Sequence, residues 1–329
     1  VGWTGERITT PQTSVKIPRG STGNKAYTAN WKVIKYTIIT LLEGGNAGSS
    51  GAYVYTVEET FTLPTPTRTG YTFWGWTGEG ITTPQPNVTI PKGSTGDKTY
   101  IENWVETGYT ITLDLNGGSG QEKVIYTITD EDFELPTPTR NGYEFVGWTG
   151  ERITTPQTSV KIPKGSTGNK AYTANWKVIR YTITLVTNGG AVIASIRYTV
   201  EDSVTLPIPP ERPGYEFAGW VLDGSGQFPS TPMIIPEGST GDRIYEAEWR
   251  VATYTITYVS HGRVYNWVQY TINNQIYFGL PEEDPSYYLP GYTFVGWKID
   301  GVSGTPRSYM LPKGSYGNRT ATMLWEPIP

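Results

Sequence analysis

Hydrophobic and polar residues alternate in short runs along the chain. In Tyr181–Leu185, for example, large side chains stand at every second position, a period typical of a β-strand with one buried face. The glycine pair Gly189-Gly190 follows, and a second alternating run, which carries Tyr198, comes after it. Glycine supplies the positive φ that a tight turn needs, so the two runs predict a β-hairpin. Runs rich in Ala, Leu, Glu and Lys, which favour helices, are absent.

A proline-rich segment and a tryptophan-containing strand follow this type of hairpin. Leu135–Arg140 (LPTPTR) cannot pair as a central strand, because proline lacks the backbone donor and fixes φ, so we expect an extended crossover along an edge. Gly142–Trp148 (GYEFVGW) then resumes as a strand, and simple alternation places Tyr143 and Phe145 on one face and Trp148 on the other. With the shorter runs that follow, we expect about five strands per unit and at most one helical turn.

The whole pattern recurs along the chain. Variants of GYEFVGW stand at residues 70–76, 142–148, 214–220 and 291–297, and Val1–Trp3 matches the end of a fifth. A second tryptophan follows the first after 28 residues in four cases and 29 in one, and successive units are 73, 72, 72 and 77 residues apart. Constant internal spacing indicates one folded unit copied in tandem. We therefore predict a mainly β fold, a tandem array of small β-rich repeat domains that forms an elongated rod.

The period divides the chain into one partial and four complete units. We predict that residues 1–35 are the C-terminal half of a truncated repeat, that residues 36–108, 109–180 and 181–253 are repeats, and that residues 254–329 are a divergent terminal repeat. Because the chain starts inside a repeat and without Met, we expect it to be part of a longer protein.

The partial unit has a close copy elsewhere in the chain. Residues 1–35 match residues 146–180 at all but two positions. The half-unit lacks the first strands of its own repeat, so in isolation it would leave an apolar face and strand edges bare. We expect the missing half to lie upstream in the parent chain or to be replaced by another chain, and self-assembly through residues 1–35 is one hypothesis.

The linkers between units are short. Four residues separate each closing tryptophan from the next opening tyrosine, as in residues 177–180, and they are rich in β-branched side chains. Such linkers leave little slack, so we expect a semi-rigid array. The alternation also changes phase here, since Trp176 and Val178 are even-numbered while Tyr181 and Ile183 are odd-numbered. We therefore predict a large rotation between neighbouring repeats.

Charge and composition exclude several classes of function. A formal charge of -4, with 26 basic residues scattered singly, provides no positive stripe for phosphates, so we expect no nucleic-acid partner. No run approaches the roughly 18 apolar residues of a membrane span, so we expect no membrane insertion within this segment. The lack of cysteine excludes disulfides, thiolate metal sites and cysteine nucleophiles, and suits an exported bacterial protein.

The motifs that could carry chemistry favour structural roles. The only histidine, His261, stands seven residues after Tyr254, as Asn116 stands in its own unit, so we interpret it as a turn residue. Residues 164–170 (KGSTGNK) lack the ending of a phosphate loop and predict a β-turn. The acidic residues 130–132 lack the ligand spacing of a calcium loop, so a solvated turn or helix N-cap is the simpler interpretation.

These observations predict that the chain is not an enzyme. An enzyme needs one distinct pocket, whereas this chain reproduces the same positions four times. We therefore expect no catalytic residue, no cofactor-binding site, no cofactor and no metal site.

The aromatic residues offer a competing interpretation, because stacked aromatic rings on a β-surface can bind sugars. Ten of the 12 tryptophans are the two landmarks of each unit, and a large aromatic at a fixed place in a small domain predicts a core residue. Trp74 and Trp267 fall outside this pattern, and Tyr287 and Tyr288 come with an insertion in the last unit. These four are the candidate ligand-binding residues.

The ordered motifs resemble the Listeria-Bacteroides repeat, the family that includes the internalin-B B-repeat. The matching residues, with equivalents in each unit, are Asn116–Gly118, Leu135–Arg140, Gly142–Trp148 and Tyr172–Trp176. The resemblance covers nearly the whole chain. It implies exported bacterial surface proteins built from tandem β-grasp-like domains, usually stalks or adhesin regions without catalysis. Residues 153–170 depart from the family's commoner aspartate-rich segment and leave little room for a β-grasp helix.

We therefore predict a non-catalytic, extracellular stalk or adhesin region at a bacterial cell surface, acting as a semi-rigid spacer or as a segment of an adhesive fibre. One alternative is a multivalent carbohydrate- or protein-binding module that uses exposed aromatics to hold a protein or glycan on a host or neighbouring cell. Another is a fibre subunit completed by a neighbouring chain.

Overall fold

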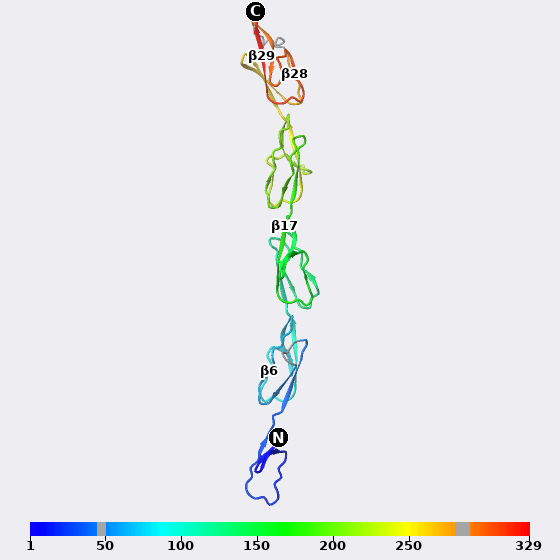
Figure 1. Cartoon of the computed structure of the whole chain (residues 1–329), viewed down its shortest axis with the longest axis vertical. Coiled ribbons are helices and arrows are strands. Elements are labelled where there is room, and N and C mark those ends of the chain that lie inside the picture. The colour runs from blue at the N-terminus through cyan, green and yellow to red at the C-terminus, as the bar shows by residue number, and fades with distance from the viewer. Residues whose placement is uncertain (45–50, 280–289) are drawn as a thin grey trace. The chain divides into compact units, whose positions relative to one another are not determined.

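The computed structural model of the chain describes residues 1–44, 51–279 and 290–329 (Figure 1). Every regular element in these ranges is a β-strand, and the strands form many small sheets in tandem. The described chain separates into two compact units, residues 1–138 with 145–175 and residues 139–144 with 176–329. The repeats are named below by the boundaries predicted from the sequence, which remain a prediction.

The repeat at residues 109–180 illustrates the arrangement. Its strands are β11 (Tyr109–Asp114), β12 (Lys123–Tyr126), β13 (Phe133–Glu134), β14 (Tyr143–Gly150), β15 (Ile153–Gln157), β16 (Lys161–Ile162) and β17 (Lys170–Val178). Five of them form one sheet in the order β12-β11-β17-β14-β15, in which the first strand, β11, lies parallel to the last, β17. The two-residue strands β13 and β16 form a separate small sheet.

The other repeats keep this order. The strands of residues 36–108 are β4 (Lys35–Leu41), β5 (Ala52–Thr56), β6 (Phe61–Thr62), β7 (Tyr71–Gly78), β8 (Ile81–Gln85), β9 (Thr89–Ile90) and β10 (Lys98–Glu106). Those of residues 181–253 are β18 (Tyr181–Val186), β19 (Ile196–Tyr198), β20 (Val204–Thr205), β21 (Tyr215–Leu222), β22 (Ile234–Ile235) and β23 (Arg243–Val251). Those of the last repeat are β24 (Tyr254–Ser260), β25 (Arg263–Tyr270), β26 (Ile276–Phe278), β27 (Tyr292–Ile299), β28 (Tyr309–Leu311) and β29 (Arg319–Pro327). The described repeats thus hold six or seven strands where about five were expected, because strands of two or three residues are too short to produce an alternating pattern.

The hairpin turns form where the sequence predicts them. Asn116 and Gly117 take φ of 46° and 81° in the connection between the antiparallel strands β11 and β12. His261 and Gly262 take φ of 52° and 73° in the matching turn between β24 and β25. Asparagine, histidine and glycine tolerate this left-handed region better than most residues. The interpretation of His261 as a turn residue is therefore confirmed.

The prediction that the phenylalanine and the tryptophan of GYxFxGW lie on opposite faces of their strand is wrong. The rings of Phe145 and Trp148 meet edge to face with centroids 5.5 Å apart, so both lie on the same face of β14. In the matching pair of strands β7 and β10, the register shifts between the partners of Phe73 and Gly75, which marks a β-bulge. A bulge adds one residue to one strand and moves every later side chain to the other face. Simple alternation cannot anticipate it.

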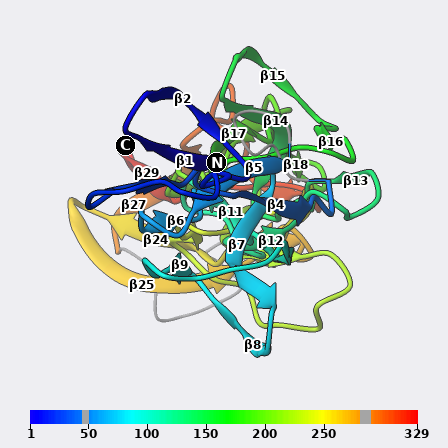
Figure 2. The ribbon, with the colours of Figure 1, turned by 90° about the horizontal axis from the view of Figure 1, so that it is seen from below.

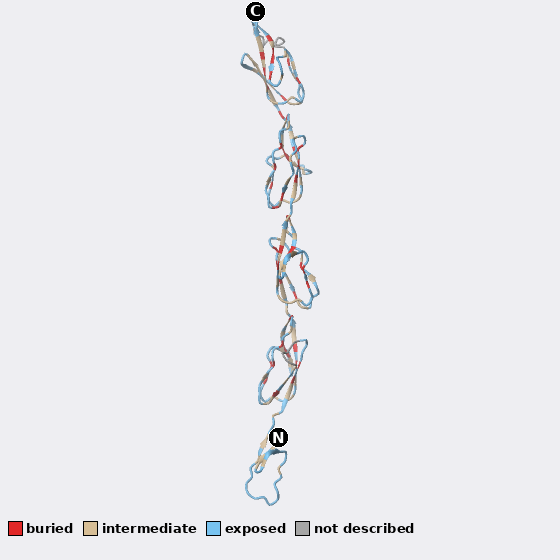
Figure 3. Cartoon of the chain, in the orientation of Figure 1, coloured by how far each residue is buried: buried red, intermediate tan, exposed pale blue. Residues whose placement is uncertain are grey.

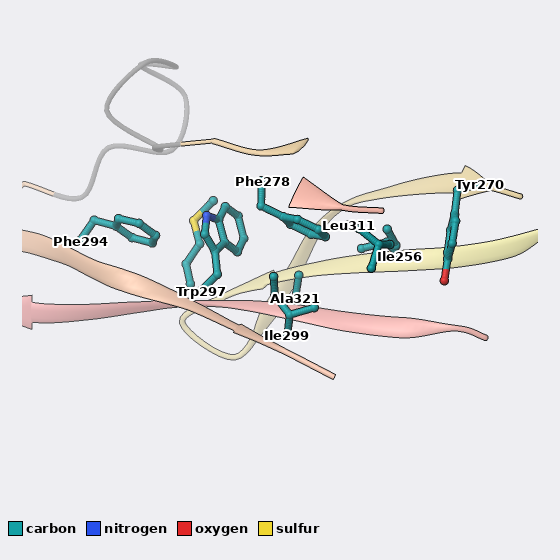
Figure 4. Close-up of a cluster of buried hydrophobic side chains, with 9 residues drawn as sticks. Ile256, Tyr270, Phe278, Phe294, Trp297, Ile299, Leu311 and Ala321 are labelled. Carbon is teal, nitrogen blue, oxygen red and sulfur yellow. The ribbon is translucent and has the colours of Figure 1, made fainter. Parts of the chain in front are cut away.

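Each complete repeat buries an aromatic core. Figure 4 shows the core of the last repeat, where Trp297 lies among Phe278, Phe294 and Ile299 between the strands. The first tryptophan landmark is buried in every complete repeat, whereas the second, such as Trp249, is only partly buried. Aromatic burial supplies much of the stabilisation of such small sheets, because each ring removes a large apolar area from water.

No described residue lies in a helix, and the acidic residues that follow the second hairpin strand, such as Glu201 and Asp202, lie in a turn instead. In residues 181–253 the backbone N–H of Asp202 donates to the carbonyl of Thr199 at 3.2 Å. The Asp202 carboxylate in return accepts a hydrogen bond from the Thr199 N–H at 2.7 Å. The likeness to a β-grasp fold remains a prediction. The sequence of residues 153–170 had already left little room for the helix of that fold.

Candidate functional site

Two of the four candidate ligand-binding residues are exposed on strands. Trp74 in β7 is 58% exposed and Trp267 in β25, the long curved yellow strand of Figure 2, is 62% exposed. Tyr287 and Tyr288 lie outside the described residues. Trp74 occupies the bulge position that holds Val146 in the next repeat, whereas Trp267 lies in a hairpin strand. The two tryptophans therefore belong to different positions of the repeat and do not form one repeated platform.

Both landmark tryptophans of residues 181–253 are engaged inside that repeat. The indole N–H of Trp220 donates to the carbonyl of Pro207 at 2.8 Å, and that of Trp249 donates to the carbonyl of Thr187 at 2.9 Å. Phe217 packs edge-on against both indoles, with centroids 5.5 Å from Trp220 and 5.6 Å from Trp249. Trp220 is also buried, at 1% exposed, so it presents no open face on which a sugar could stack.

A buried tyrosine docks on the glycine turn of every complete repeat. In residues 109–180 the hydroxyl of Tyr126 donates to the carbonyl of Gly168 at 2.5 Å. The next side chain, Asn169, accepts a hydrogen bond from the N–H of Thr110 at 2.9 Å. The equivalent tyrosines, which bind the turn in the same way, are Tyr55, Tyr198 and Tyr270. The KGSTGNK segment thus has a structural task, which is to hold the first two strands.

Burial changes the acidity of this tyrosine. Desolvation raises the pKa of Tyr126 above its ordinary value of 10.0, and the neighbouring Tyr109 and Tyr172 add to the effect. The pKa of Tyr55 is also raised, again chiefly by burial. Both hydroxyls therefore stay protonated and keep donating to the turn at neutral pH.

An arginine at the end of the proline crossover stacks on the tyrosine of GYxFxGW. The guanidinium carbon of Arg140 lies 3.8 Å from the centroid of the Tyr143 ring, and Arg68 is at the same distance from Tyr71. Arg68 also donates to the carbonyl of Glu43 at 2.6 Å. A cation over an aromatic face is attracted by the ring quadrupole, so this contact fastens the crossover to the strand. The recurrent arginine three residues before the tyrosine is the sequence signal that could have shown it.

The acidic residues 130–132 pair with β16 and with the turn that follows it. Asp132 lies 2.7 Å from the Nζ of Lys161 and accepts the N–H of Lys164 at 2.7 Å, and these bonds hold the pKa of its carboxyl below the usual range. All three side chains are solvent-exposed, so the pairs stabilise only weakly. Among the described residues, no three His, Cys, Asp or Glu side chains gather as metal ligands would.

The first glycine of GYxFxGW lies against the next repeat, and the sequence analysis did not predict this contact. A Cβ on Gly142 would lie 2.4 Å from the Cβ of Val200, and a Cβ on Gly70 would lie 2.5 Å from the Cδ1 of Ile128. Gly214 meets Ile272 in the same way. The sequence does carry a signal for this contact, because a β-branched residue follows the Tyr-Thr pair of each hairpin, as Ile128 follows Tyr126 and Thr127.

A sequence profile of the Listeria-Bacteroides repeat domain matches residues 36–100, 109–175, 181–240 and 254–314. The chain belongs to this family. Each of the four matched segments contains the first strand of a repeat and its first tryptophan strand, which are β4 and β7, β11 and β14, β18 and β21, and β24 and β27.

Individual relatives share part of their length with this Listeria-Bacteroides repeat protein. A protein of Evansella cellulosilytica described as a Gly-rich membrane protein is 27% identical over 287 residues, which is 84% of this chain and 32% of the relative. A second membrane protein of that organism is 25% identical over 280 residues, or 83% of this chain and 40% of the relative. Internalin H of Listeria monocytogenes is 34% identical over 83 residues, or 25% of this chain and 15% of the relative.

The chain therefore spans well under two thirds of the relatives that it matches along most of its length. None of the described residues forms a helix long and apolar enough to cross a membrane.

Proposed function

We propose that this chain is the repeat region of a bacterial cell-surface protein, and that it acts as a non-catalytic, semi-rigid spacer or adhesive-fibre segment. The family match and the membrane and internalin relatives support a surface location outside the cell. The repetition supports a role without catalysis, because the same side chains build the same core in each copy instead of converging on one pocket. The proposal requires no cofactor.

The main support for the spacer role is that very few residues between successive repeats lack backbone hydrogen bonds to a repeat. The last strand of residues 36–108 continues through Glu106, and the next N–H, from Thr107, donates to the carbonyl of Gly70 at 2.9 Å. Ile179 and Ala252 make the same bond at the two later junctions. The side chain of the following repeat, such as Ile128, packs on that same glycine. A joint with so few unconstrained dihedrals favours a stiff array.

Small-angle X-ray scattering of the whole chain tests this proposal. Strands of about eight residues at roughly 3.3 Å each give a repeat of about 25–30 Å, so four in line reach on the order of 100 Å. The radius of gyration should then be about 30 Å, compared with about 20 Å for a compact chain of this length. A value near the compact one would refute the spacer. As a matched control, insertion of Gly-Ser-Gly-Ser after Gly108 should broaden the distance distribution without changing the melting of the repeats.

The exposure of Trp74 and Trp267 favours a second candidate, a surface that binds a glycan or a protein through aromatic rings. Iodide quenching of tryptophan fluorescence tests it. Addition of a binding glycan should protect part of the quenchable fluorescence in the wild-type chain and none in the Trp74→Ala, Trp267→Ala double variant. Screening on a glycan array without any Trp-dependent binding would count against a sugar ligand.

A further inference from the structure

In every complete repeat the first strand lies beside the last strand and parallel to it. β11 begins the repeat at residues 109–180 and β17 ends it, and four aligned residue pairs join them, from Ile111 opposite Lys170 to Asp114 opposite Thr173. The same pairing joins β4 to β10, β18 to β23 and β24 to β29. The strands of residues 1–35, which are β1 (Gly2–Gly5), β2 (Ile8–Gln12) and β3 (Thr28–Asn30), pair in antiparallel fashion. The parallel pair is therefore a feature of the four complete repeats.

This topology determines how a repeat responds to a pull along the chain. Tension enters the repeat at the N-terminal end of β11 and leaves it at the C-terminal end of β17. Because the two strands are parallel, these are opposite ends of the pair, and the pull slides one strand along the other. The hydrogen bonds of a parallel pair are evenly spaced across the gap between the strands, so sliding loads them together. A pull at matching ends would open them one at a time.

A side chain next to the last strand also holds the start of the first strand. The backbone N–H of Thr110 in β11 donates to the side chain of Asn169, directly before β17, at 2.9 Å. This bond connects the same two strands, so sliding must break it as well. The equivalent bonds, at 2.7 to 2.8 Å, join Thr37 to Asp97, Thr182 to Asp242 and Thr255 to Asn318.

A second side-chain bond lies just beyond the end of the first strand. The side-chain amide of Asn116 donates to the carbonyl of Ala174 in β17 at 3.2 Å. In residues 181–253 the amide of Asn188 donates to the carbonyl of Ala247 in β23 at 3.1 Å. In these two repeats, side chains therefore join the first strand to the last at both ends of the ladder.

The paired strands also lie in the interior of their sheet. In the order β12-β11-β17-β14-β15, both β11 and β17 have a neighbouring strand on each side. Both carry buried side chains, drawn red in Figure 3, which are Ile111 and Leu113 in β11 and Tyr172 and Ala174 in β17. Hydrogen bonds that are shielded from solvent belong to the most stable part of a fold. The strands that receive the pull are thus the best protected strands of the repeat.

We propose that the first and last strands of each complete repeat form a shear pair, which keeps the repeat folded while the chain is under tension. This function goes beyond the spacer role. Stiffness of a spacer depends on the joints between repeats, whereas resistance to tension depends on bonds inside each repeat. The array would then transmit force between whatever holds its two ends.

Two attachment geometries within one repeat test the direction of loading. The chain has no cysteine, so pulling handles can be attached at introduced cysteines alone. Gly108→Cys with Arg180→Cys pulls the shear pair from opposite ends, whereas Gly108→Cys with Thr167→Cys pulls it from matching ends. At one constant force in optical tweezers, the repeat should unfold roughly tenfold faster or more from matching ends, because each hydrogen bond that no longer shares the load contributes about fivefold. Equal rates in the two geometries would overturn the proposal.

Two sets of variants test the side-chain bonds with the whole chain held at its two ends. The first set removes the acceptor beside the shear pair in each repeat, through Asp97→Ala, Asn169→Ala, Asp242→Ala and Asn318→Ala. The control set removes the acceptor of a backbone N–H in the turn after the second hairpin strand, where the bonds are 2.7 to 2.9 Å long, through Glu59→Ala, Asp130→Ala, Asp202→Ala and Asn274→Ala.

Both sets remove one hydrogen bond of the same kind per repeat, so the urea midpoint should fall by a similar amount in each. Forced unfolding depends on the unfolding rate and not on equilibrium stability alone. At constant force only the first set should unfold faster, by about fivefold, the effect of one hydrogen bond. Each unfolding step should lengthen the chain by about 230 Å, the gain from extending about 72 residues.

Equal acceleration in the two sets, or none in the first, would refute the shear pair, as would gradual extension without steps. The spacer role is tested by scattering without force. A compact chain with high resistance to tension would refute the spacer alone, and an extended chain that yields equally in both pulling geometries would refute the shear pair alone.

Discussion

At the residue scale, the repeat depends on a few side chains that connect elements far apart in the chain. Tyr126 is the clearest of them, because its ring lies in the core while its hydroxyl holds the turn at Gly168. The sequence marks this tyrosine as part of an alternating strand and marks the turn by its glycines. The bond between them joins residues 42 apart, so no local pattern predicts it.

Tyr126→Phe should destabilise the repeat at residues 109–180 while preserving its core. The substitution keeps the ring and leaves the Gly168 carbonyl without its donor, which costs about 1 kcal/mol in the free energy of unfolding. Urea denaturation, with hydrogen exchange of the β11 and β12 amides as the local readout, measures the change. Tyr277→Phe, at a site that is 56% exposed, is the matched control and should be nearly neutral. Equal effects of the two variants would contradict the role of the hydroxyl.

The buried tyrosines also predict how stability depends on pH. Burial raises the pKa of Tyr55, Tyr100, Tyr126 and Tyr172 above 10.0 in the folded chain. Their stabilisation is fully present below that ordinary value. It is lost as pH rises through the raised folded pKa, because unfolded tyrosines release their protons first. The urea midpoint should therefore be constant from about pH 7 to 9 and fall above about pH 10. A midpoint that stays flat to about pH 11.5 would contradict this.

At the scale of the element, the bulge in GYxFxGW decides which side chains meet. In β7 it places Phe73 and Trp76 on one face, with centroids 5.4 Å apart. The glycine at the bulge also allows β8 to approach, since a Cβ on Gly75 would lie 2.5 Å from the backbone nitrogen of Gln85. The strand itself could be predicted from its sequence, but its bulge could not, because the Gly75 requirement comes from a neighbouring backbone.

Gly75→Ala should destabilise the repeat at residues 36–108 more than Gly93→Ala does. Both glycines have positive φ, 145° and 89°, so each substitution introduces backbone strain of about 1–3 kcal/mol. Only at Gly75 does the added methyl group also collide with backbone, which should cost about 1–3 kcal/mol more. Gly93 faces open space and serves as the control. Hydrogen exchange of the β7 and β8 amides reports the difference, and similar exchange in the two variants would refute the steric role.

At the scale of the whole molecule, the junctions between repeats determine whether tandem copies act together. Gly142 packs on Val200, and the same glycine carbonyl accepts the N–H of Ile179 from the linker. One small residue thus contacts both the linker and the next repeat. The short linker could be predicted from its four-residue length, whereas the packing on glycine required the folded neighbour.

A comparison of Gly142→Ala with Gly291→Ala separates the effect of lost packing at the junction from the effect of backbone strain. Their φ values, 76° and 81°, are nearly equal, but within the described ranges no atom lies within 4 Å of a Cβ at Gly291. Strain should therefore be similar, at about 1–2 kcal/mol, and only Gly142→Ala should disturb Val200. The N–H of Gly238, which donates to the Val200 carbonyl at 2.7 Å, should exchange faster in Gly142→Ala alone. Unchanged exchange at Gly238 would show that the glycine is not needed for the junction.

The sequence by itself determined the repeat, the mainly β class, the hairpin turns at Asn116 and His261 and the family of the chain. These features depend on spacing, on period-two alternation and on φ preferences, all of which act over a few residues. Only the tertiary structure decided the parallel pairing of β11 with β17 and the contact between the Phe145 and Trp148 rings on one face of β14. It also decided the packing of Val200 against Gly142. Those contacts bring together residues from different strands or different repeats, and burial against a particular neighbour selects them.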